Sequence, residues 1–288
     1  MGSLSTCAWC GSVVDGALDC PFCGAAIDIA RSTTKSGWAP LPARRDLVTL
    51  SFGSSSCQIG GNLVPVADFH LAGDDWVYFS HHVLLWKDTS IAIEAQSLKG
   101  VFKRLLAGMP LVMTQTKGPG RIAFSRDAPG KLIALPLKPG QTVDVREHLF
   151  LLASSSVRFD WFNPGVWFRH KDDNDYETFY PVGSLMDRFT ADVEPGLLLL
   201  HAHGHVMTRD LAADQTILVK PTAFLFKDRA VDMELHFEHP AGMKWSNSRS
   251  LWLKLRGPGR VAIQSVSERV EGEHVSIYDH SRATRKQW

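Results

Sequence analysis

One short phrase recurs three times along the chain at nearly regular intervals. The segments LAGDDW, LKPGQT and LAADQT begin at Leu71, Leu137 and Leu211, so successive copies lie 66 and 74 residues apart. Each copy joins an apolar start to a polar turn, the usual composition of a tight connection between strands. Similarity at a fixed period indicates a repeated structural unit, and here it predicts three copies of a unit of about 70 residues.

The same register extends forward from these turns. Apolar residues correspond in three sets, namely Val77, Val143 and Ile217; Leu85, Leu151 and Leu225; and Trp86, Leu152 and Phe226. The phrase GPGR, at 118 and again at 257, places one Gly-Pro turn at the junction of the first two units and another after the third. Neither copy has the spacing of a phosphate-binding loop, so a shared turn geometry is the better explanation.

Between the turns the chain is typical of strands. Turn signals such as GDD, APGK, KPGQ and NPG recur roughly every 8–12 residues, as in all-β folds. One helical pattern interrupts them, in SLKGVFKRLLAGMP, where apolar side chains follow a period of about 3.6 residues at 98–106. We expect a mainly β fold of three tandem units.

Four of the five cysteines lie in the segment CAWCGSVVDGALDCPFCG. Cys7 with Cys10, and Cys20 with Cys23, form two CxxCG motifs. Each motif suits a tight turn that directs two thiolates at one ion, and zinc takes four such ligands tetrahedrally. The sequence therefore predicts a structural zinc ribbon, with Cys57 a buried small residue outside it.

These patterns divide the 288 residues into six segments. They are a zinc ribbon at 1–30, a linker rich in Ser, Thr, Pro and Arg at 31–45, β units at 46–112, 113–190 and 191–268, and a polar tail at 269–288.

The overall composition excludes several classes of protein. The formal net charge is +1, so no global field attracts the chain to nucleic acid or anionic lipid. No apolar run approaches the roughly 18–20 residues that span a bilayer. The N-terminus has neither a secretory signal nor the Arg- and Ser-rich composition of a transit peptide. We expect a cytoplasmic protein.

Several segments resemble the altered-inheritance-of-mitochondria family of mitochondrial biogenesis proteins and their bacterial relatives. They are GPGRIAFSRDAPGKLIALPLKPGQTVDVREHLFLLASSSVRFDW, MDRFT, PGLLLLHAHG, QTILVKP and GPGRVAIQSV, and the resemblance covers about 45–268. It implies three domains similar to the tryptophan-RNA-attenuation-protein (TRAP) fold, a short double-stranded β-helix. It also implies a homotrimer whose ring holds nine such domains, with the ribbon as an addition found in some bacterial members.

A second metal site is conceivable at HAHGHV. His201, His203 and His205 would share one face of a strand and could bind a transition metal. The repeat places this segment over the turn DAPGK, however, where side chains do not alternate as in a strand. A polar turn is therefore the favoured prediction.

Two further segments carry side chains that invite a functional interpretation. In QTVDVREHLF, Asp144, Arg146 and His148 alternate with apolar residues, which predicts a half-buried strand whose polar face could contact another subunit through Arg146. In FDWFNPGVWF, Trp161 and Trp167 flank an Asn-Pro-Gly turn, where they either join the core or form an exposed partner-binding surface.

No convincing nucleophile or acid–base set emerges, so the sequence favours a protein that is not an enzyme. The leading hypothesis is a homotrimeric β-ring scaffold that recruits a protein through the ribbon. The alternative is a ring that binds a small ligand or RNA, by analogy with the TRAP fold. Residues 1–30 contain no Lys or Arg, which argues against nucleic acid, and Trp9 and Phe22 are the expected anchors for a protein partner.

Overall fold

The computed structural model describes residues 4–28, 32–95, 113–172, 175–238 and 250–266. Its regular elements are strands apart from two short 3₁₀ segments, at His81–Val83 and Pro221–Ala223. The expected mainly β fold is confirmed. The predicted helix at 98–106 and the polar tail at 269–288 lie outside the described residues.

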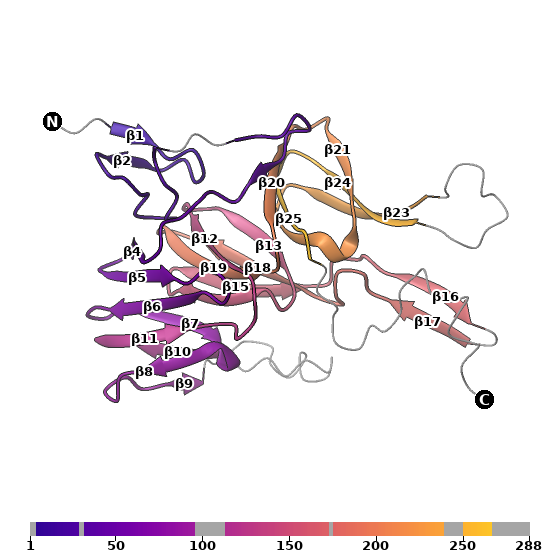
Figure 1. Cartoon of the computed structure of the whole chain (residues 1–288). Coiled ribbons are helices and arrows are strands. Elements are labelled where there is room, and N and C mark those ends of the chain that lie inside the picture. Colours follow the sequence, from indigo (N-terminus) through magenta and orange to yellow (C-terminus); the bar gives the residue numbers. More distant parts are fainter. Residues whose placement is uncertain (1–3, 29–31, 96–112, 173–174, 239–249, 267–288) are drawn as a thin grey trace.

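Eighteen of the strands form three sets of six, called units 1, 2 and 3 (Figure 1). Unit 1 contains β6 (Val66–Leu71), β7 (Trp76–Ser80), β8 (Leu84–Lys87), β9 (Glu94–Ala95), β10 (Met113–Lys117) and β11 (Gly120–Phe124). Unit 2 contains β12 (Lys131–Leu137), β13 (Thr142–Arg146), β14 (Phe150–Ser154), β15 (Val157–Phe162), β18 (Met186–Ala191) and β19 (Gly196–Ala202). Unit 3 contains β20 (Val206–Leu211), β21 (Thr216–Val219), β22 (Phe224–Asp228), β23 (Asp232–Glu238), β24 (Ser250–Arg256) and β25 (Gly259–Gln264).

The three units share one antiparallel pairing order. In each, the first strand pairs with the sixth, which pairs with the third, while the second pairs with the fifth, which pairs with the fourth. The third strand carries a register shift in every unit, at Leu85, Leu151 and Leu225. These are the residues that the sequence register equates, so the repeat is present in the hydrogen-bond pattern as well as in the sequence.

Neighbouring units are joined by a recurrent contact between strands. The second strand of one unit pairs with the third strand of the next, as β7 with β14 and β13 with β22. The register is the same at both junctions, since Tyr78 lies opposite Ala153 and Asp144 lies opposite Lys227. Each junction therefore continues a sheet from one unit into the next.

The cores lie between the sheets because strand side chains alternate between two faces. On β12, Ile133 and Leu135 enter one apolar cluster, while Leu132 and Ala134 enter another. A third cluster fills unit 3 around Phe224 and Leu253. A strand buried on both faces reads as a continuous apolar run, as in LIALPL, rather than as strict alternation.

The two Gly-Pro turns occupy equivalent places, between the fifth and sixth strands of units 1 and 3. A Cβ at Gly118 would lie 2.9 Å from the backbone of Leu71, and one at Gly257 would collide with the backbone of Ala212. Glycine is therefore required by close packing at the point where the chain passes from one sheet to the other. In unit 2 the corresponding connection, between β18 and β19, has a different sequence that leads to Gly196.

The structure corrects the unit boundaries predicted at 112 and 190. β10 and β11 follow residue 112 but pair with β7 and β6, so they complete unit 1. β19 follows residue 190 but pairs with β12 and β14 of unit 2. The sequence misplaced these borders because the last strands of each unit return to its first ones, and such long-range pairing has no local sequence signal.

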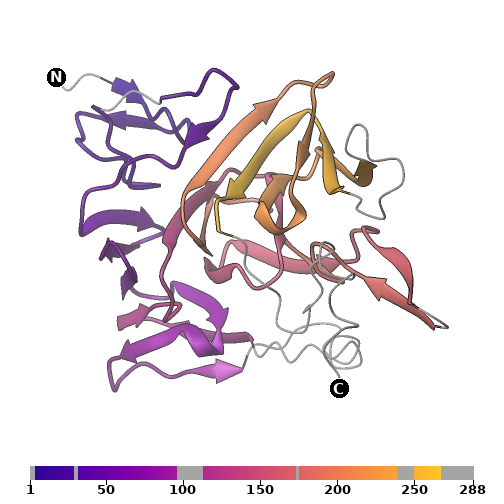
Figure 2. The ribbon, with the colours of Figure 1, turned by 45° about the vertical axis from the view of Figure 1, so that its right-hand side comes forward.

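The N-terminal ribbon lies beside units 1 and 3 (Figures 1 and 2). It contains the hairpin of β1 (Leu4–Thr6) and β2 (Val13–Asp15), and two further strands, β4 (Val48–Phe52) and β5 (Ser55–Gly60), extend unit 1 from β6. The segment predicted as a linker instead packs on the body: its β3 (Ala39–Pro40) pairs with β20, and Ala39 is buried. A separate hairpin of β16 (Phe168–Asp172) and β17 (Asp175–Phe179) projects from unit 2.

Candidate metal centre

The two CxxCG motifs form matching turns. The amide of Gly11 donates to the carbonyl of Cys7, and the amide of Gly24 donates to the carbonyl of Cys20, at 2.9 and 2.8 Å. Both glycines have positive φ, +70° and +74°, which favours glycine. Each turn thereby brings its two cysteines to one side.

All four sulfurs come together. The Sγ atoms of Cys7 and Cys23 are 3.6 Å apart, as are those of Cys10 and Cys20, and the whole set lies within 4.8 Å. Four sulfurs placed about 2.3 Å from one ion at tetrahedral angles would lie about 3.8 Å from one another. The four predicted ligands therefore lie close enough together to hold one metal ion.

The thiols also perturb one another. Contact with the Cys10 sulfur, together with burial, raises the pKa of Cys20 to about 11. Contacts with Cys10 and Cys20 raise the pKa of Cys23, whereas donation from Cys20 and Cys23 lowers that of Cys10. One thiolate is thus stabilised by neighbouring S–H groups, and a divalent cation would replace those protons. Thiolate ligands in a tetrahedron fit zinc.

Cys57 stands apart from this set, as predicted. Its side chain is 1% exposed in the core of unit 1, and burial raises the pKa of its thiol. Among the described residues, the four N-terminal cysteines are the one group of three or more Cys, His, Asp or Glu side chains close enough to hold a metal.

Trp9, expected as an exposed anchor, is instead 3% exposed. The guanidinium of Arg260 lies 5.7 Å from the centre of its ring, and Arg260 Nη2 donates to the carbonyl of Trp9 at 3.5 Å. The sequence suggested exposure because the ribbon is too small to bury a tryptophan by itself. Trp9 is buried because it packs in the ribbon's own apolar cluster, with Val14 and Ala25, and because Arg260 of unit 3 lies against it.

Polar contacts fix the other side of the ribbon. Arg45 pairs with Asp19 at 2.6 Å and with Asp28 at 3.2 Å, and the amide of Ser51 donates to the carbonyl of Pro21. Apolar side chains that face solvent remain on the ribbon, namely Leu4, Val13, Leu18 and Phe22. Phe22 thus remains a candidate contact for a partner, at 39% exposed.

The three histidines of the HAHGH segment do not form one group. His201 lies near the end of β19 and is 1% exposed, with Nε2 3.2 Å from the carbonyl oxygen of Ala128. His203 lies in the following turn, with its ring 4.8 Å from that of His201, while His205 is exposed. The turn prediction therefore fits His203 and His205 but not His201, which is a buried strand residue.

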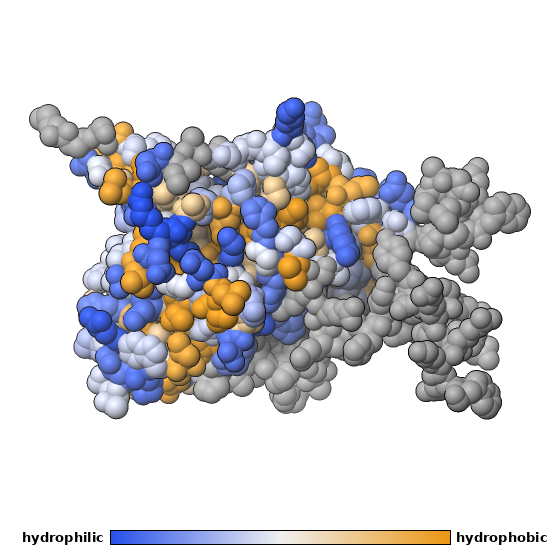
Figure 3. Space-filling model, in the orientation of Figure 1, coloured by the Kyte–Doolittle hydropathy of each residue, from blue (hydrophilic) through white to orange (hydrophobic). Residues whose placement is uncertain are grey.

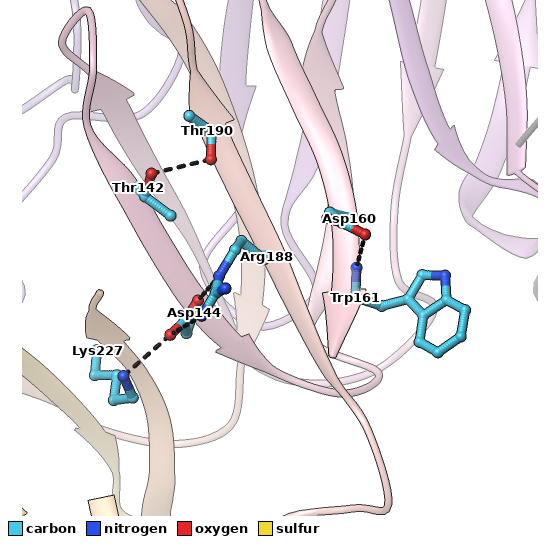
Figure 4. Close-up of polar contacts among 7 residues, drawn as sticks. All are labelled: Thr142, Asp144, Asp160, Trp161, Arg188, Thr190 and Lys227. Carbon is cyan, nitrogen blue, oxygen red and sulfur yellow. Dashed lines mark hydrogen bonds and ion pairs between the residues drawn. The ribbon is translucent and has the colours of Figure 1, made fainter. Parts of the chain in front are cut away.

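The strand at 142–146 differs from the predicted half-buried strand, because both of its faces are buried. Asp144 is 0% exposed and accepts hydrogen bonds from Arg188 Nε at 2.6 Å and from Lys227 Nζ at 3.0 Å (Figure 4). Arg146 is 1% exposed and donates to the carbonyl of Thr222 at 2.9 Å, so it links units 2 and 3 within the chain. His148, just beyond the strand, has an exposed side chain and a φ of +68°.

Replacing Asp144 with Asn should lower the free energy of unfolding by about 3–5 kcal/mol, because Lys227 would remain buried without a counter-charge. Chemical denaturation of the full chain measures this effect. The matched control is Asp192→Asn, which removes a similar contact from Arg158 on the surface and should change stability little. Equal effects of the two substitutions would contradict the structural role of Asp144.

The aromatic residues near the Asn-Pro-Gly turn are divided between two environments. Trp161 is partly buried, and its indole points away from the Asp144 contacts in Figure 4. Trp167 is 46% exposed, with the guanidinium of Arg169 5.8 Å from its ring. Trp167 therefore fits the predicted exposed surface better than Trp161 does.

In the part of the chain that the structure describes, no helix is long and apolar enough to cross a membrane.

Comparison with known proteins identifies the family to which the body of the chain is related. No curated protein matches it significantly. Its structure is similar to the crystal structure of protein SPYM3_0169 from Streptococcus pyogenes, with a TM-score of 0.54 and 18% sequence identity over 74% of this chain and 94% of that one. Residues 57–266 match the family described as mitochondrial biogenesis AIM24, and the ribbon precedes the matched region. The chain belongs to the AIM24 family.

Proposed function

We propose that this protein is a non-enzymatic scaffold, a homotrimeric ring whose zinc ribbons recruit a protein partner. The observation that carries the proposal is the pair of open strands at the two ends of the three-unit array. The second strand of unit 3, β21, and the third strand of unit 1, β8, are terminal strands of their sheets. At both junctions inside the chain, the second strand of one unit pairs with the third strand of the next.

Exposure of side chains at the open ends supports this pairing. On β8, Leu85 and Trp86 are 55% and 40% exposed, whereas their equivalents in units 2 and 3 are buried. On β21, Leu218 is 41% exposed, whereas the equivalent Tyr78 and Asp144 are buried. Figure 3 shows apolar surface over the strands of unit 1. Apolar strand edges of this kind favour association with another chain.

The internal junctions supply the register of the proposed contact. Tyr78 with Ala153, and Asp144 with Lys227, are equivalent opposed pairs at the two junctions. Carried to the open ends, the same register places Leu218 of one copy opposite Lys87 of the next. Such a head-to-tail contact generates a closed ring when the rotation per copy is an exact fraction of a turn, and otherwise an open filament. The proposal is a ring of three chains.

Three ribbons on one ring would act together. The exposed Val13, Leu18 and Phe22 give each ribbon an apolar surface. Linked copies raise the apparent affinity for a partner with several binding sites. Zinc would serve to hold the ribbon's fold rather than to supply chemistry, because all four of its ligand positions are cysteines and none is left open for a substrate.

The test combines mass measurement with partner capture. Light scattering should give three times the chain mass of 31.9 kDa at micromolar concentration. Full-length protein in which Leu18 and Phe22 are both changed to Ser should keep that mass and its zinc but lose the captured protein. A stable single chain would refute the ring, and capture that is unchanged by the double substitution would refute the role of the ribbon.

A further inference from the structure

The first strand of unit 2 has an open edge that its counterparts lack. In unit 1 the first strand, β6, is covered by β5, and in unit 3 the first strand, β20, is covered by β3. Among the strands that the structure describes, β12 pairs with β19 alone and is the terminal strand of its six-stranded sheet. The repeat therefore leaves one vacant strand position, on the side of β12 that faces the ribbon.

Backbone groups of β12 point into this position. His201 lies opposite Leu132, but its amide donates to the carbonyl of Leu149, on the other side of β19. The carbonyl of Leu132 instead accepts a hydrogen bond from Arg44 Nη1 at 3.1 Å. The backbone N–H and C=O of Leu132 therefore point away from β19. Because these directions alternate along an antiparallel strand, the backbone groups of Ala134 and Pro136 point the same way. Pro136 has no N–H to leave unpaired, as is usual on edge strands.

Ala134 is the informative residue of this edge. It is 3% exposed, yet no hydrogen bond within the described residues uses its outward N–H and C=O. Buried backbone groups are nearly always paired, so an unpaired N–H and C=O side by side indicate the place of a missing partner. An extended chain offers both groups at the required spacing.

Two cavities follow this edge, with Trp9 lining both. One, of about 530 Å³, is lined by Lys131, Leu132 and Ala134 of β12 together with Arg44 and the ribbon. The other, of about 300 Å³, is lined by Leu135, Pro136 and Leu137, with Lys138, Asp228 and Arg260. The ribbon and β12 thus line both cavities, which are together called the cleft.

The charge of the cleft selects the kind of partner. Arg44, Lys131, Lys138 and Arg260 contribute four cations, against the single carboxylate of Asp228. Lys131, Lys138 and Arg44 make no ion pair within the described residues, and burial lowers the pKa of Arg44. The aliphatic part of Arg44 packs beneath Gly24 of the second CxxCG turn, so its position depends on the ribbon.

We propose that the cleft between the ribbon and β12 binds an extended, acidic segment of a partner protein, which adds a strand to the edge of β12. Its backbone would pair with Ala134, and its carboxylates would face Arg44 and Lys131. Main-chain pairing supplies affinity in such strand addition, while the side-chain contacts supply specificity. This inference rests on the proposed function and specifies the partner's chemistry.

The probe is a fluorescein-labelled peptide of four Glu-Val repeats, with four Lys-Val repeats as its charge-reversed match. Fluorescence anisotropy with the full-length zinc-loaded protein should show at least tenfold tighter binding of the acidic peptide. Arg44→Gln combined with Lys131→Gln should weaken this binding tenfold or more, while Lys117→Gln, whose surface pair with Asp74 lies elsewhere, should leave it unchanged. Zinc content and thermal stability verify that each variant is folded.

Strand pairing is tested by changing the peptide rather than the protein. Two acidic peptides carry N-methyl groups on alternate amides, one on the Glu residues and one on the Val residues. Since only every second amide of an added strand pairs with β12, one peptide should lose at least tenfold in affinity and the other little. Absence of binding, equal binding of the acidic and basic peptides, or equal effects of the two methylation patterns would each overturn the proposal. These readouts depend on neither the mass of the ring nor capture through Phe22.

Discussion

Replacing Trp86 with Asp is expected to convert a three-chain ring into single chains. Trp86 is 40% exposed on the open strand β8, whereas its equivalents, Leu152 and Phe226, are 0% and 1% exposed within internal junctions. Burying the roughly 100 Å² that remains exposed would contribute about 2.5 kcal/mol at each contact. An aspartate would instead bring an unpaired charge into that contact.

Light scattering measures the outcome, and Phe237→Asp is its matched control. Phe237 is also a 40% exposed aromatic residue, but it lies on β23, outside the proposed contact, so this variant should keep the mass of three chains. Loss of the ring in both variants would show a general loss of stability. A ring that survives Trp86→Asp would contradict the pairing of β8 with β21.

The register itself can be tested by exchanging charge. Leu218→Lys would place a lysine opposite Lys87 of the neighbouring copy, and like charges directly opposite each other destabilise paired strands. Adding Lys87→Glu should restore the assembly, by analogy with the Asp144–Lys227 pair at the internal junction. Failure of this second change to restore the ring would show that the register is different.

Replacing Cys20 with Ser is expected to abolish metal binding and to release the ribbon. The zinc content measured by elemental analysis should fall from one ion per chain to none, because a tetrahedral cysteine site loses one of its four ligands. Binding of structural zinc contributes roughly 10–16 kcal/mol to the folding of such small segments. Limited proteolysis should then remove residues preceding about 40 within minutes, since opening of this segment would no longer be opposed by the metal.

The body should remain folded in that variant, with a lower melting temperature. The apolar clusters of the body are separate from that of the ribbon, so they do not depend on the metal. The melting temperature should fall because Leu41, which packs against both clusters, and Arg260, which contacts Trp9, would lose their ribbon contacts. The control is Cys57→Ala, which lies in the core of unit 1 and should retain one zinc. Zinc retained by Cys20→Ser, or lost from Cys57→Ala, would refute the assignment of the four ligands.

Much of the architecture was predictable because it depends on local patterns. The turns at Leu71, Leu137 and Leu211 gave the number of units, and the register of apolar residues equated the third strands in advance. The CxxCG spacing identified the four sulfurs, since such turns bring cysteines together whatever the rest of the fold does. Cys57, predicted to be a buried small residue, lies in the core of unit 1.

Burial was harder to predict than the positions of strands. Alternation in QTVDVREHLF suggested a polar outer face, yet Asp144 and Arg146 are buried because the next unit covers them. Trp9 was expected to face solvent, yet the docked ribbon encloses it beside Arg260. Asp144 and Arg146 are covered by residues of the next unit, which lie about 80 positions away in the sequence, and Trp9 by ribbon residues together with Arg260 of unit 3.

The sequence alone therefore determined the repeat, the β character and the grouping of the four cysteines, because turn residues and side-chain periodicity act over a few positions. Tertiary structure alone decided which strands close each unit, which polar groups are buried and which edges stay open. Those features depend on pairing between segments such as β7 and β14, or β12 and β19, whose partners are set by the packing of whole units. The vacant edge of β12 became visible only when the three units could be compared strand by strand.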